Sequence, residues 1–141
     1  ISHPEGRGLN RAMTQALADA KISAPDIDYV NAHAPSTSIG DASELKALKS
    51  VFPLPQEVMI SSTKALTGHG LSLSSIMEAS FCCLALKDGF LPGSAHVTEP
   101  DPEIGHLRLL RQTEQTQAKR ILSNSSGFGG ANVSVIFEQT E

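Results

Sequence analysis

The chain has 141 residues, of which 40% are hydrophobic and 18% are charged, and its formal net charge is −4. This length and apolar fraction are typical of one domain with a packed core, and they exclude a disordered chain. The absence of a basic run argues against nucleic acid as the main partner. No apolar stretch is long enough to span a bilayer, and the N-terminal region lacks the pattern of a secretion signal. We therefore expect a single cytoplasmic domain without a membrane span.

Three further features concern the surroundings of the chain. Its charged fraction is low for a small domain, which indicates that another chain or domain covers part of the surface. Cys82 and Cys83 are neighbours in a helical run, where their side chains point about 100° apart. We expect both in the core of a protein from a reducing compartment, rather than in a disulfide or metal site. The chain begins at Ile1 and soon enters a helix, so we expect it to be part of a longer polypeptide.

The first third of the chain predicts a helix, a strand and a polar loop. After a turn-rich lead-in over residues 3–8, apolar residues at helical spacing predict an amphipathic helix that ends near Lys21. A short strand over residues 27–30 ends at Asn31-Ala32-His33, and a polar loop over residues 35–40 follows.

A second helix is predicted to begin at Asp41, which is a suitable N-cap residue. Glu44 follows three residues later, which is the spacing of a capping box. Apolar residues over 45–52 supply one face of this helix, and Pro53 and Pro55 end it.

The most informative stretch lies in the middle of the chain. Val58, Met59 and Ile60 predict a buried strand, which leads into a polar turn carrying Lys64 and then His69. A long apolar helix follows over residues 71–88 and closes at Gly89, a residue suited to a left-handed C-terminal cap. Because this helix is apolar on most sides, we expect it to be largely buried.

The last third predicts short strands. Residues 90–105 are irregular, residues 107–110 predict a short edge strand, and residues 112–119 predict an exposed connection. Two strands over 121–124 and 132–137 are joined by a glycine-rich turn and predict a hairpin. The imperfect alternation of residues 132–137 favours a central strand over an edge strand. The element order predicts a mixed α/β domain with parallel pairing through its crossovers.

Three ionisable side chains, His33, Lys64 and His69, follow predicted strands, where open α/β sheets collect their ligands. A lone histidine is more often a satisfied structural residue, but three such groups at two strand exits favour a site. His69 near a helix N-terminus favours the neutral imidazole, which can donate a hydrogen bond to a developing oxyanion. Lys64 can fix a carboxylate or orient a histidine.

Other patterns leave alternatives open. Glu78 stands among apolar neighbours, so it either pairs with Lys64 or faces a wet seam. The glycine-rich turn over residues 127–130 is either an ordinary tight connection or an anion-binding set of amides. The SxxK pattern from Ser61 to Lys64 starts in a strand, where positions three apart lie on opposite faces, so we interpret it as a chance match.

Three ordered segments resemble motifs of β-ketoacyl-acyl-carrier-protein synthases, which are thiolase-fold condensing enzymes. Residues 31–37 (NAHAPST) are similar to NAHGTST, and Gly40, Asp41 and Glu44 are similar to the GDxxE that follows it. Residues 61–69 (SSTKALTGH) resemble SSTKxxTGH almost letter for letter, and residues 123–132 (SNSSGFGGAN) resemble SNSFGFGGTN.

This resemblance covers essentially the whole chain. It implies that residues 1–141 form the C-terminal half of a layered αβαβα fold, with a mixed sheet and a long buried helix. It also implies decarboxylative condensation of acyl and malonyl thioesters in fatty acid or polyketide synthesis. No metal and no cofactor bound by the chain are implied, because phosphopantetheine arrives on the acyl carrier protein. That carrier is the expected partner, together with a second ketosynthase subunit in a homodimer or heterodimer.

The resemblance implies roles for individual residues. His33 and His69 match the two histidines that promote decarboxylation and stabilise the enolate, and Lys64 matches the lysine that orders the site. Glu78 matches the buried acidic companion of that lysine, and Thr37 a threonine that binds the pantetheine arm. A further set matches the gate beside the acyl pocket: Phe128, Gly129 and Gly130.

The sequence also departs from the family pattern. Ala34-Pro35 replaces Gly-Thr, which removes one expected pantetheine contact, and Ser126 replaces a phenylalanine of the gate. Neither cysteine matches the nucleophile motif, which belongs to the N-terminal half, so we expect the isolated chain to be inactive. The alternative is a non-catalytic, chain-length-factor-like or degenerate partner subunit. The retention of His33, Lys64 and His69 favours the enzyme.

Overall fold

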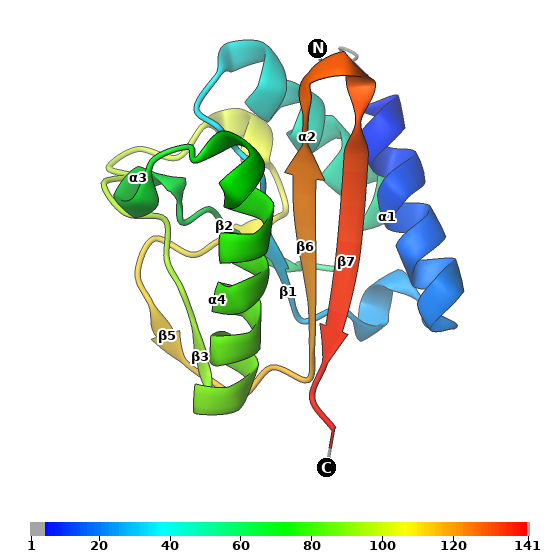
Figure 1. Cartoon of the computed structure of the whole chain (residues 1–141), viewed down its shortest axis with the longest axis vertical. Helices are drawn as coiled ribbons and strands as arrows, with labels where there is room; N and C mark the ends of the chain where they lie inside the picture. Colours follow the sequence, from blue (N-terminus) through cyan, green and yellow to red (C-terminus); the bar gives the residue numbers. More distant parts are fainter. Residues whose placement is uncertain (1–4, 141) are drawn as a thin grey trace.

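A five-stranded sheet with the order β4-β2-β1-β6-β7 organises the fold (Figure 1). The computed structural model describes residues 5–140, so residues 3 and 4 of the predicted lead-in lie outside it. Neighbouring strands are parallel except for β6 and β7, which form the predicted antiparallel hairpin. The five strands are β1 (Tyr29–Asn31), β2 (Met59–Ser61), β4 (Arg108–Leu109), β6 (Arg120–Ser126) and β7 (Asn132–Glu138).

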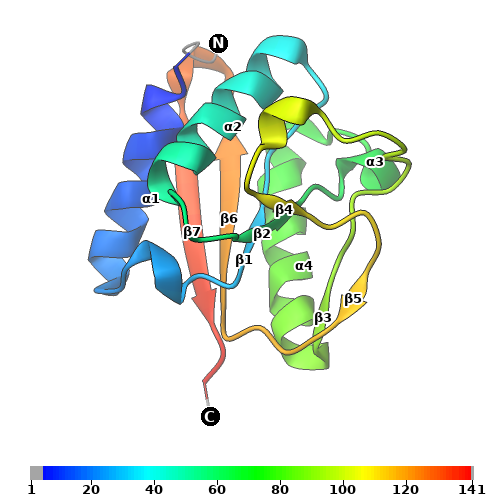
Figure 2. The same cartoon turned by 180° about the vertical axis from the view of Figure 1, so that it is seen from behind.

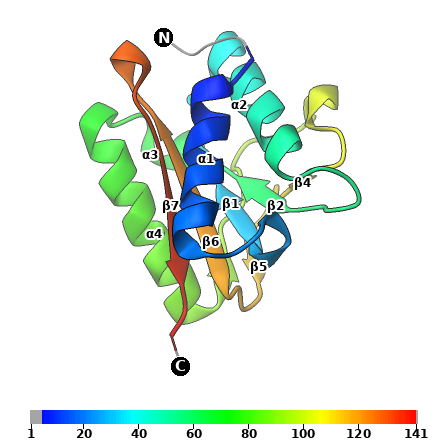
Figure 3. The ribbon, with the colours of Figure 1, turned by 90° about the vertical axis from the view of Figure 1, so that its right-hand side faces the viewer.

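Helices cover both faces of this sheet, which gives the layered arrangement seen edge-on in Figure 3. The helices α1 (Arg7–Ala20) and α2 (Ser38–Val51) lie on one face, and α4 (Ser74–Asp88) lies on the other. Each face has its own apolar core, one built around Met13, Leu48 and Phe52 and the other around Tyr29, Leu91 and Ile121. Parallel strands need such crossovers, and the expected mixed α/β class is confirmed.

Shorter elements complete the chain. The helix α3 (Lys64–Thr67) follows β2, and an antiparallel pair, β3 (Phe90–Leu91) with β5 (Glu114–Gln115), lies beside the main sheet (Figure 2). The connection predicted over residues 112–119 therefore contains a strand, while residues 107–110 contain the predicted edge strand β4. The single-turn helices are η1 (Ala24–Asp26), η2 (Leu71–Leu73), η3 (Pro102–Ile104) and η4 (Phe128–Gly130). No helix within residues 5–140 is long and apolar enough to cross a bilayer.

The prediction of a central strand at residues 132–137 is wrong. Among the strands of residues 5–140, β7 pairs only with β6 and forms an edge of the sheet. Val133 and Val135 are 54% and 42% exposed, because α4 packs mainly on β6 and leaves this part of the sheet uncovered. The face of β7 that points toward α4 is therefore only partly covered by that helix. This partial burial is why the apolar and polar residues of β7 do not alternate strictly.

The expectation that the long helix is largely buried is also wrong for this chain. A helix packed on one sheet can bury only the side that faces the sheet, here through Glu78, Cys82, Ala85 and Leu86. The opposite side exposes Cys83, so only one of the two cysteines lies in the core as predicted. It also exposes several large apolar residues at or before α4: Leu71, Leu73, Ile76 and Leu84.

The second helix begins earlier than predicted. Its N-cap is Thr37 rather than Asp41, because Asp41 already donates its backbone N–H to the Thr37 carbonyl within the first turn. The Asp41 carboxylate instead accepts from the backbone N–H groups of Ser36 and Thr37, at 3.1 and 3.2 Å. The capping-box spacing of Asp41 and Glu44 therefore indicated that a helix begins nearby. The side chains of these two residues, however, bind the loop that precedes the helix.

Candidate active site

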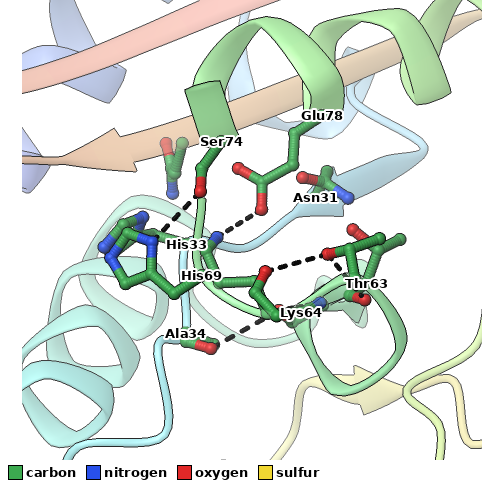
Figure 4. A network of polar contacts seen from close by, with 12 residues as sticks. Asn31, His33, Ala34, Thr63, Lys64, His69, Ser74 and Glu78 are labelled. Atoms are coloured by element: carbon green, nitrogen blue, oxygen red, sulfur yellow. Dashed lines mark hydrogen bonds and ion pairs between the residues drawn. The ribbon is translucent and has the colours of Figure 1, made fainter. Parts of the chain in front are cut away.

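The imidazoles of His33 and His69 meet at the carboxyl edge of the sheet (Figure 4). Their ring centroids are 5.2 Å apart, and the rings pack edge to face at 82°. Asn31, at the end of β1, is in register with Ser61, at the end of β2, so the loops after both strands leave from the same edge. The predicted convergence of the two histidines is therefore present in the structure.

Lys64 and Glu78 form an ion pair behind the histidines, between the start of α3 and the first half of α4 (Figure 4). Both side chains are buried, with exposures of 5% and 1%, so Glu78 pairs with Lys64 and does not face a wet seam. Burial raises the pKa of Glu78, whereas the hydrogen bond from Lys64 lowers it. The second carboxylate oxygen of Glu78 has no hydrogen-bond partner among the described residues.

His33 is held in the neutral form. The residue is only 7% exposed, and burial together with the charges of Lys64 and His69 lowers the pKa of His33 to about 4. Its Nδ1 is buried and has no hydrogen-bond partner within residues 5–140. At neutral pH this side chain therefore offers an uncharged ring with one unused nitrogen.

His69 is oriented by its own loop. The backbone N–H of Leu71 donates to Nδ1 of His69 at 3.2 Å, and the Ser74 hydroxyl lies 3.0 Å from the same atom. A backbone N–H can only donate, so Nδ1 accepts and the ring proton lies on Nε2. His69 is exposed, and its Nε2–H has no hydrogen-bond partner within residues 5–140, so it is a donor of the kind that stabilises an oxyanion.

Glu44 fixes the backbone that carries His33. Its carboxylate accepts from the N–H groups of His33 and Ala34, at 3.0 and 2.7 Å, and from the Asn124 side-chain amide at 3.2 Å. Glu44 is buried, and burial raises its pKa against the opposing effect of these three donors. The spacing of Asp41 and Glu44 predicts a capping role for Glu44, whereas the structure places its carboxylate between α2, the loop after β1, and β6.

A second polar chain, which sequence reasoning missed, lies beneath the site. The Tyr29 hydroxyl lies 2.6 Å from Oγ of Ser61, which donates in turn to the Pro92 carbonyl. The Asn31 amide NH₂ donates to the Tyr29 hydroxyl at 3.4 Å, which leaves Oδ1 of Asn31 buried and unpaired among the described residues. A sequence signal was available, because Asn31 and Ser61 occupy the polar ends of apolar strands.

The loop between β1 and α2 is strained. Ala34 and Ser36 have φ values of 24° and 68°, in the region that favours glycine. Ala34 stands where the similar motif NAHGTST has glycine, so a residue with a Cβ occupies a conformation that favours glycine. Thr37, the predicted pantetheine contact, is exposed at the end of this loop.

Two cavities adjoin the histidine pair. The smaller, which we name the His33 cavity, has a volume of about 140 Å³ and lies among α1, α2 and the β6–β7 turn. The larger, which we name the α2 cavity, has a volume of about 890 Å³ and is lined by Thr37, Lys64 and His69. Gly130 lines the His33 cavity, whereas Phe128 is 84% exposed at the hairpin tip. No group of His, Cys, Asp and Glu within residues 5–140 is arranged to hold a metal ion.

The comparisons with known proteins agree with this fold. Residues 1–98 match the family described as "Beta-ketoacyl synthase, C-terminal domain". The chain is 39% identical over 139 residues to the 3-oxoacyl-[acyl-carrier-protein] synthase 2 of Staphylococcus aureus, covering 98% of this chain and 34% of that protein. It is 38% identical over 136 residues to synthase 1 of Buchnera aphidicola, covering 96% of this chain and 33% of that protein.

Solved structures of ketosynthases superpose closely on the chain. A β-ketoacyl synthase from Burkholderia phymatum has a TM-score of 0.88 at 35% identity, covering 98% of this chain and 34% of that one. A ketosynthase solved with its type II polyketide acyl carrier protein has a TM-score of 0.92 at 28% identity, covering 99% and 34%. The ishigamide ketosynthase/chain length factor has a TM-score of 0.90 at 27% identity, with the same coverage.

The fold and these matches define a ketosynthase domain of the thiolase-like class. The chain belongs to the β-ketoacyl synthase C-terminal domain family. It spans about a third of the length of the curated relatives that it matches.

Proposed function

We propose that this chain supplies the malonyl-decarboxylating side of a β-ketoacyl-[acyl-carrier-protein] synthase in fatty acid or polyketide synthesis. The observation that carries the proposal is the His33–His69 pair, at 5.2 Å between ring centroids, in front of the buried Lys64–Glu78 ion pair. Two imidazoles at one point can hold the oxygen of one enolate, which is the charge that decarboxylation creates.

The reaction begins with a malonyl thioester whose carbonyl oxygen faces the imidazole pair. The bond between the α-carbon and the carboxylate breaks, its electron pair moves onto the thioester oxygen as an enolate, and CO₂ leaves. Nε2–H of His69 donates to the developing oxyanion, and His33 adds a second contact from the other side. The enolate carbon then attacks an acyl thioester held on a cysteine, a carbon–carbon bond forms, and the cysteine leaves as a thiolate.

In this proposal the positive charge of Lys64 acts on the protonation of His33 and does not contact the enolate. Glu78 holds the ammonium in place, and the ammonium helps to keep His33 unprotonated. A neutral ring can donate without forming an ion pair with the substrate carboxylate, which must leave as neutral CO₂. We therefore assign Lys64 and Glu78 as positioning residues, with Asp41 and Glu44 holding the loop that carries His33.

The remaining parts of the proposal concern substrate and partners. Thr37, Phe128, Gly129 and Gly130 are assigned to the pantetheine arm and acyl gate, and the acyl carrier protein is the carrier of both thioesters. The acyl-carrying cysteine is assigned to a part of the enzyme outside these 141 residues, and no cofactor is assigned to the chain. The complete enzyme is proposed to be a cytoplasmic homodimer, or a heterodimer with a related subunit. A solved relative in complex with its acyl carrier protein supports this choice of partner.

One observation favours a second candidate, a non-catalytic partner that shapes the acyl pocket of another ketosynthase. Ala34-Pro35 stands where the family motif has Gly-Thr, and Ala34 adopts a positive φ that suits glycine better. The similar ishigamide structure pairs a ketosynthase with a chain length factor. We favour the enzyme because a purely structural subunit has no need of two imidazoles and a buried ion pair at one point.

The test uses a hybrid polypeptide in which this chain replaces the corresponding third of the Staphylococcus aureus synthase 2. The hybrid should release CO₂ from malonyl carrier protein and condense the product with an acyl carrier protein substrate. The 141-residue chain alone should not condense them. Condensation by the chain alone would refute the assignment of the nucleophile to another part of the enzyme. A hybrid that is folded and binds carrier protein but releases no CO₂ would favour the non-catalytic candidate.

A further inference from the structure

Two polar side chains of the β6–β7 hairpin are joined to the loop that carries His33. Asn124 of β6 and Ser134 of β7 are direct partners across this antiparallel pair. The Ser134 hydroxyl donates to Oδ1 of Asn124 at 2.8 Å, and Nδ2 of Asn124 donates to Oε1 of Glu44 at 3.2 Å. The same Oε1 accepts from the backbone N–H of His33 at 3.0 Å. A continuous chain of hydrogen bonds, which we name the Ser134 relay, therefore runs from the edge strand to His33.

The amide of Asn124 has one orientation that suits both of its neighbours. The side chain is fully buried between Glu44 and Ser134. An ionised carboxylate only accepts hydrogen bonds, so the NH₂ group must face Glu44 and the carbonyl oxygen must face Ser134. Nδ2 also lies 3.4 Å from Sδ of Met13, which is a weak acceptor. The Ser134 hydroxyl is the donor that the structure gives to Oδ1, so it helps to fix the direction of the amide.

Glu44 depends on neutral donors, because no cation is bound to it. In the described part of the chain its carboxylate forms no ion pair. Its two oxygens accept from the N–H groups of His33 and Ala34 and from the amide of Asn124. Burial raises the pKa of Glu44, whereas these three donors and the more distant charge of Lys64 lower it. The loss of one donor is therefore costly for a buried charge without a counter-ion.

The contacts of Glu44 with the loop require the ionised carboxylate. Protonation of either oxygen places its hydrogen opposite a donor hydrogen and weakens that contact. The loop also needs the restraint, because Ala34 has a φ of 24°, which is unfavourable for a residue with a Cβ. A neutral Glu44 thus lets the loop relax, and the imidazole of His33 moves with it.

We propose that Asn124 and Ser134 are positioning residues for His33, which they orient through the carboxylate of Glu44. The inference rests on the proposed function, in which His33 contacts the enolate. Neither Asn124 nor Ser134 touches the substrate in this account, and Ser134 acts through three successive hydrogen bonds. Their effect on decarboxylation passes through the charge of Glu44, so it depends on pH.

The experiment compares wild type and four variants of the hybrid polypeptide. Asn124→Leu removes the amide and keeps a similar branched shape, Ser134→Ala removes only the hydroxyl, and Ser134→Thr restores it. Ile136→Val is the matched control, because it shortens an apolar side chain on the same face of β7, in the core and outside the relay. For each form, kcat for CO₂ release from malonyl carrier protein is measured as a function of pH. Hydrogen–deuterium exchange of the backbone N–H groups of residues 33 and 34 is measured separately.

Asn124→Leu should move the acid limb of the kcat profile to higher pH, because Glu44 then binds a proton more readily. The expected shift is about 1–2 pH units, which is the value of one hydrogen bond to a charged group. Ser134→Ala should give a smaller shift in the same direction, and Ser134→Thr should return the profile to that of wild type. Exchange at residues 33 and 34 should become faster in the same order. Ile136→Val should leave both readouts unchanged.

The outcomes separate this inference from the proposed function. CO₂ release with the wild-type pH profile in both Asn124→Leu and Ser134→Ala overturns the relay and leaves the decarboxylase intact. An equal shift in Ile136→Val also overturns the relay, because a general loss of stability then explains it. If Asn124→Leu does not fold, the difference between Ser134→Ala and Ser134→Thr decides. Faster exchange in the relay variants without CO₂ release by wild type supports the relay and overturns the decarboxylase. The absence of both turnover and an exchange difference overturns both.

Discussion

The carboxylate of Glu44 accepts hydrogen bonds from the backbone N–H groups of both His33 and Ala34, at 3.0 and 2.7 Å. One buried side chain of α2 thereby fixes the loop that presents a proposed catalytic imidazole. The proposed arrangement of the two histidines therefore depends on this contact.

Replacing Glu44 should therefore loosen the site and destabilise the fold. Glu44→Gln turns one acceptor into a donor that faces a backbone N–H, so at least one buried donor loses its partner. We expect the free energy of unfolding to fall by about 1–3 kcal/mol in urea titrations. Glu57→Gln, at an exposed position, should change it by less than about 0.5 kcal/mol. Equal effects of the two substitutions would show that the buried contact contributes nothing.

The Lys64–Glu78 pair should be costly to break from one side. Glu78→Leu leaves a buried ammonium without its partner, and we expect a loss of about 3–5 kcal/mol in the free energy of unfolding. The double variant Lys64→Met with Glu78→Leu removes both charges and should recover most of that loss. Glu114→Gln breaks the exposed pair with Arg108 and should cost less than about 1 kcal/mol. A double variant no more stable than Glu78→Leu would contradict this reading of the ion pair.

The protonation of His33 should make stability depend on pH. Burial, with Lys64 and His69, lowers the pKa of His33 from 6.5 to about 4, so between these values the unfolded chain binds a proton that the folded chain does not. This contribution to stability is fully present above pH 6.5 and is lost as the pH falls toward 4. In NMR titrations the His33 ring should remain neutral down to about pH 5. A His33 midpoint at 6.5 or above would contradict the proposed environment.

The strain at Ala34 gives a prediction with the opposite sign. Ala34→Gly places glycine at a φ of 24°, and we expect it to stabilise the fold by about 0.5–1 kcal/mol despite the added entropy of the unfolded chain. Ala42→Gly, at an exposed position within α2, is the matched control and should destabilise by about 0.5–1 kcal/mol. Thermal unfolding of the two variants decides, because the predicted shifts have opposite directions.

Sequence reasoning was most successful where a single physical rule determines which side chains come together. Parallel strands β1 and β2 end in register, so side chains that follow them must meet at one edge, which is why the approach of His33 to His69 could be predicted. The partner of Glu78 could be predicted for a similar reason, because a buried carboxylate in an apolar helix needs a cation and Lys64 was the nearest candidate.

Sequence reasoning failed where the burial or position of an element depends on what packs against that element. The apolar pattern of α4 is the same whether one side or every side is covered, so the exposure of Ile76 and Leu84 could not be predicted. The position of β7 at a sheet edge depends on strand order, which its alternation does not specify. The spacing of Asp41 and Glu44 suits both a capping box and a clamp on the preceding loop, and only the path of that loop distinguishes them.

The most direct test of the central claim is a double-mutant cycle on the two imidazoles in the hybrid polypeptide, with malonyl decarboxylation as the readout. If both rings hold one enolate oxygen, His33→Ala and His69→Ala should each lower kcat by about 10²–10³. The double variant should then lose much less than the product of the two single losses, because the residues act as a unit. Retention of more than half the wild-type rate by either single variant would contradict the claim.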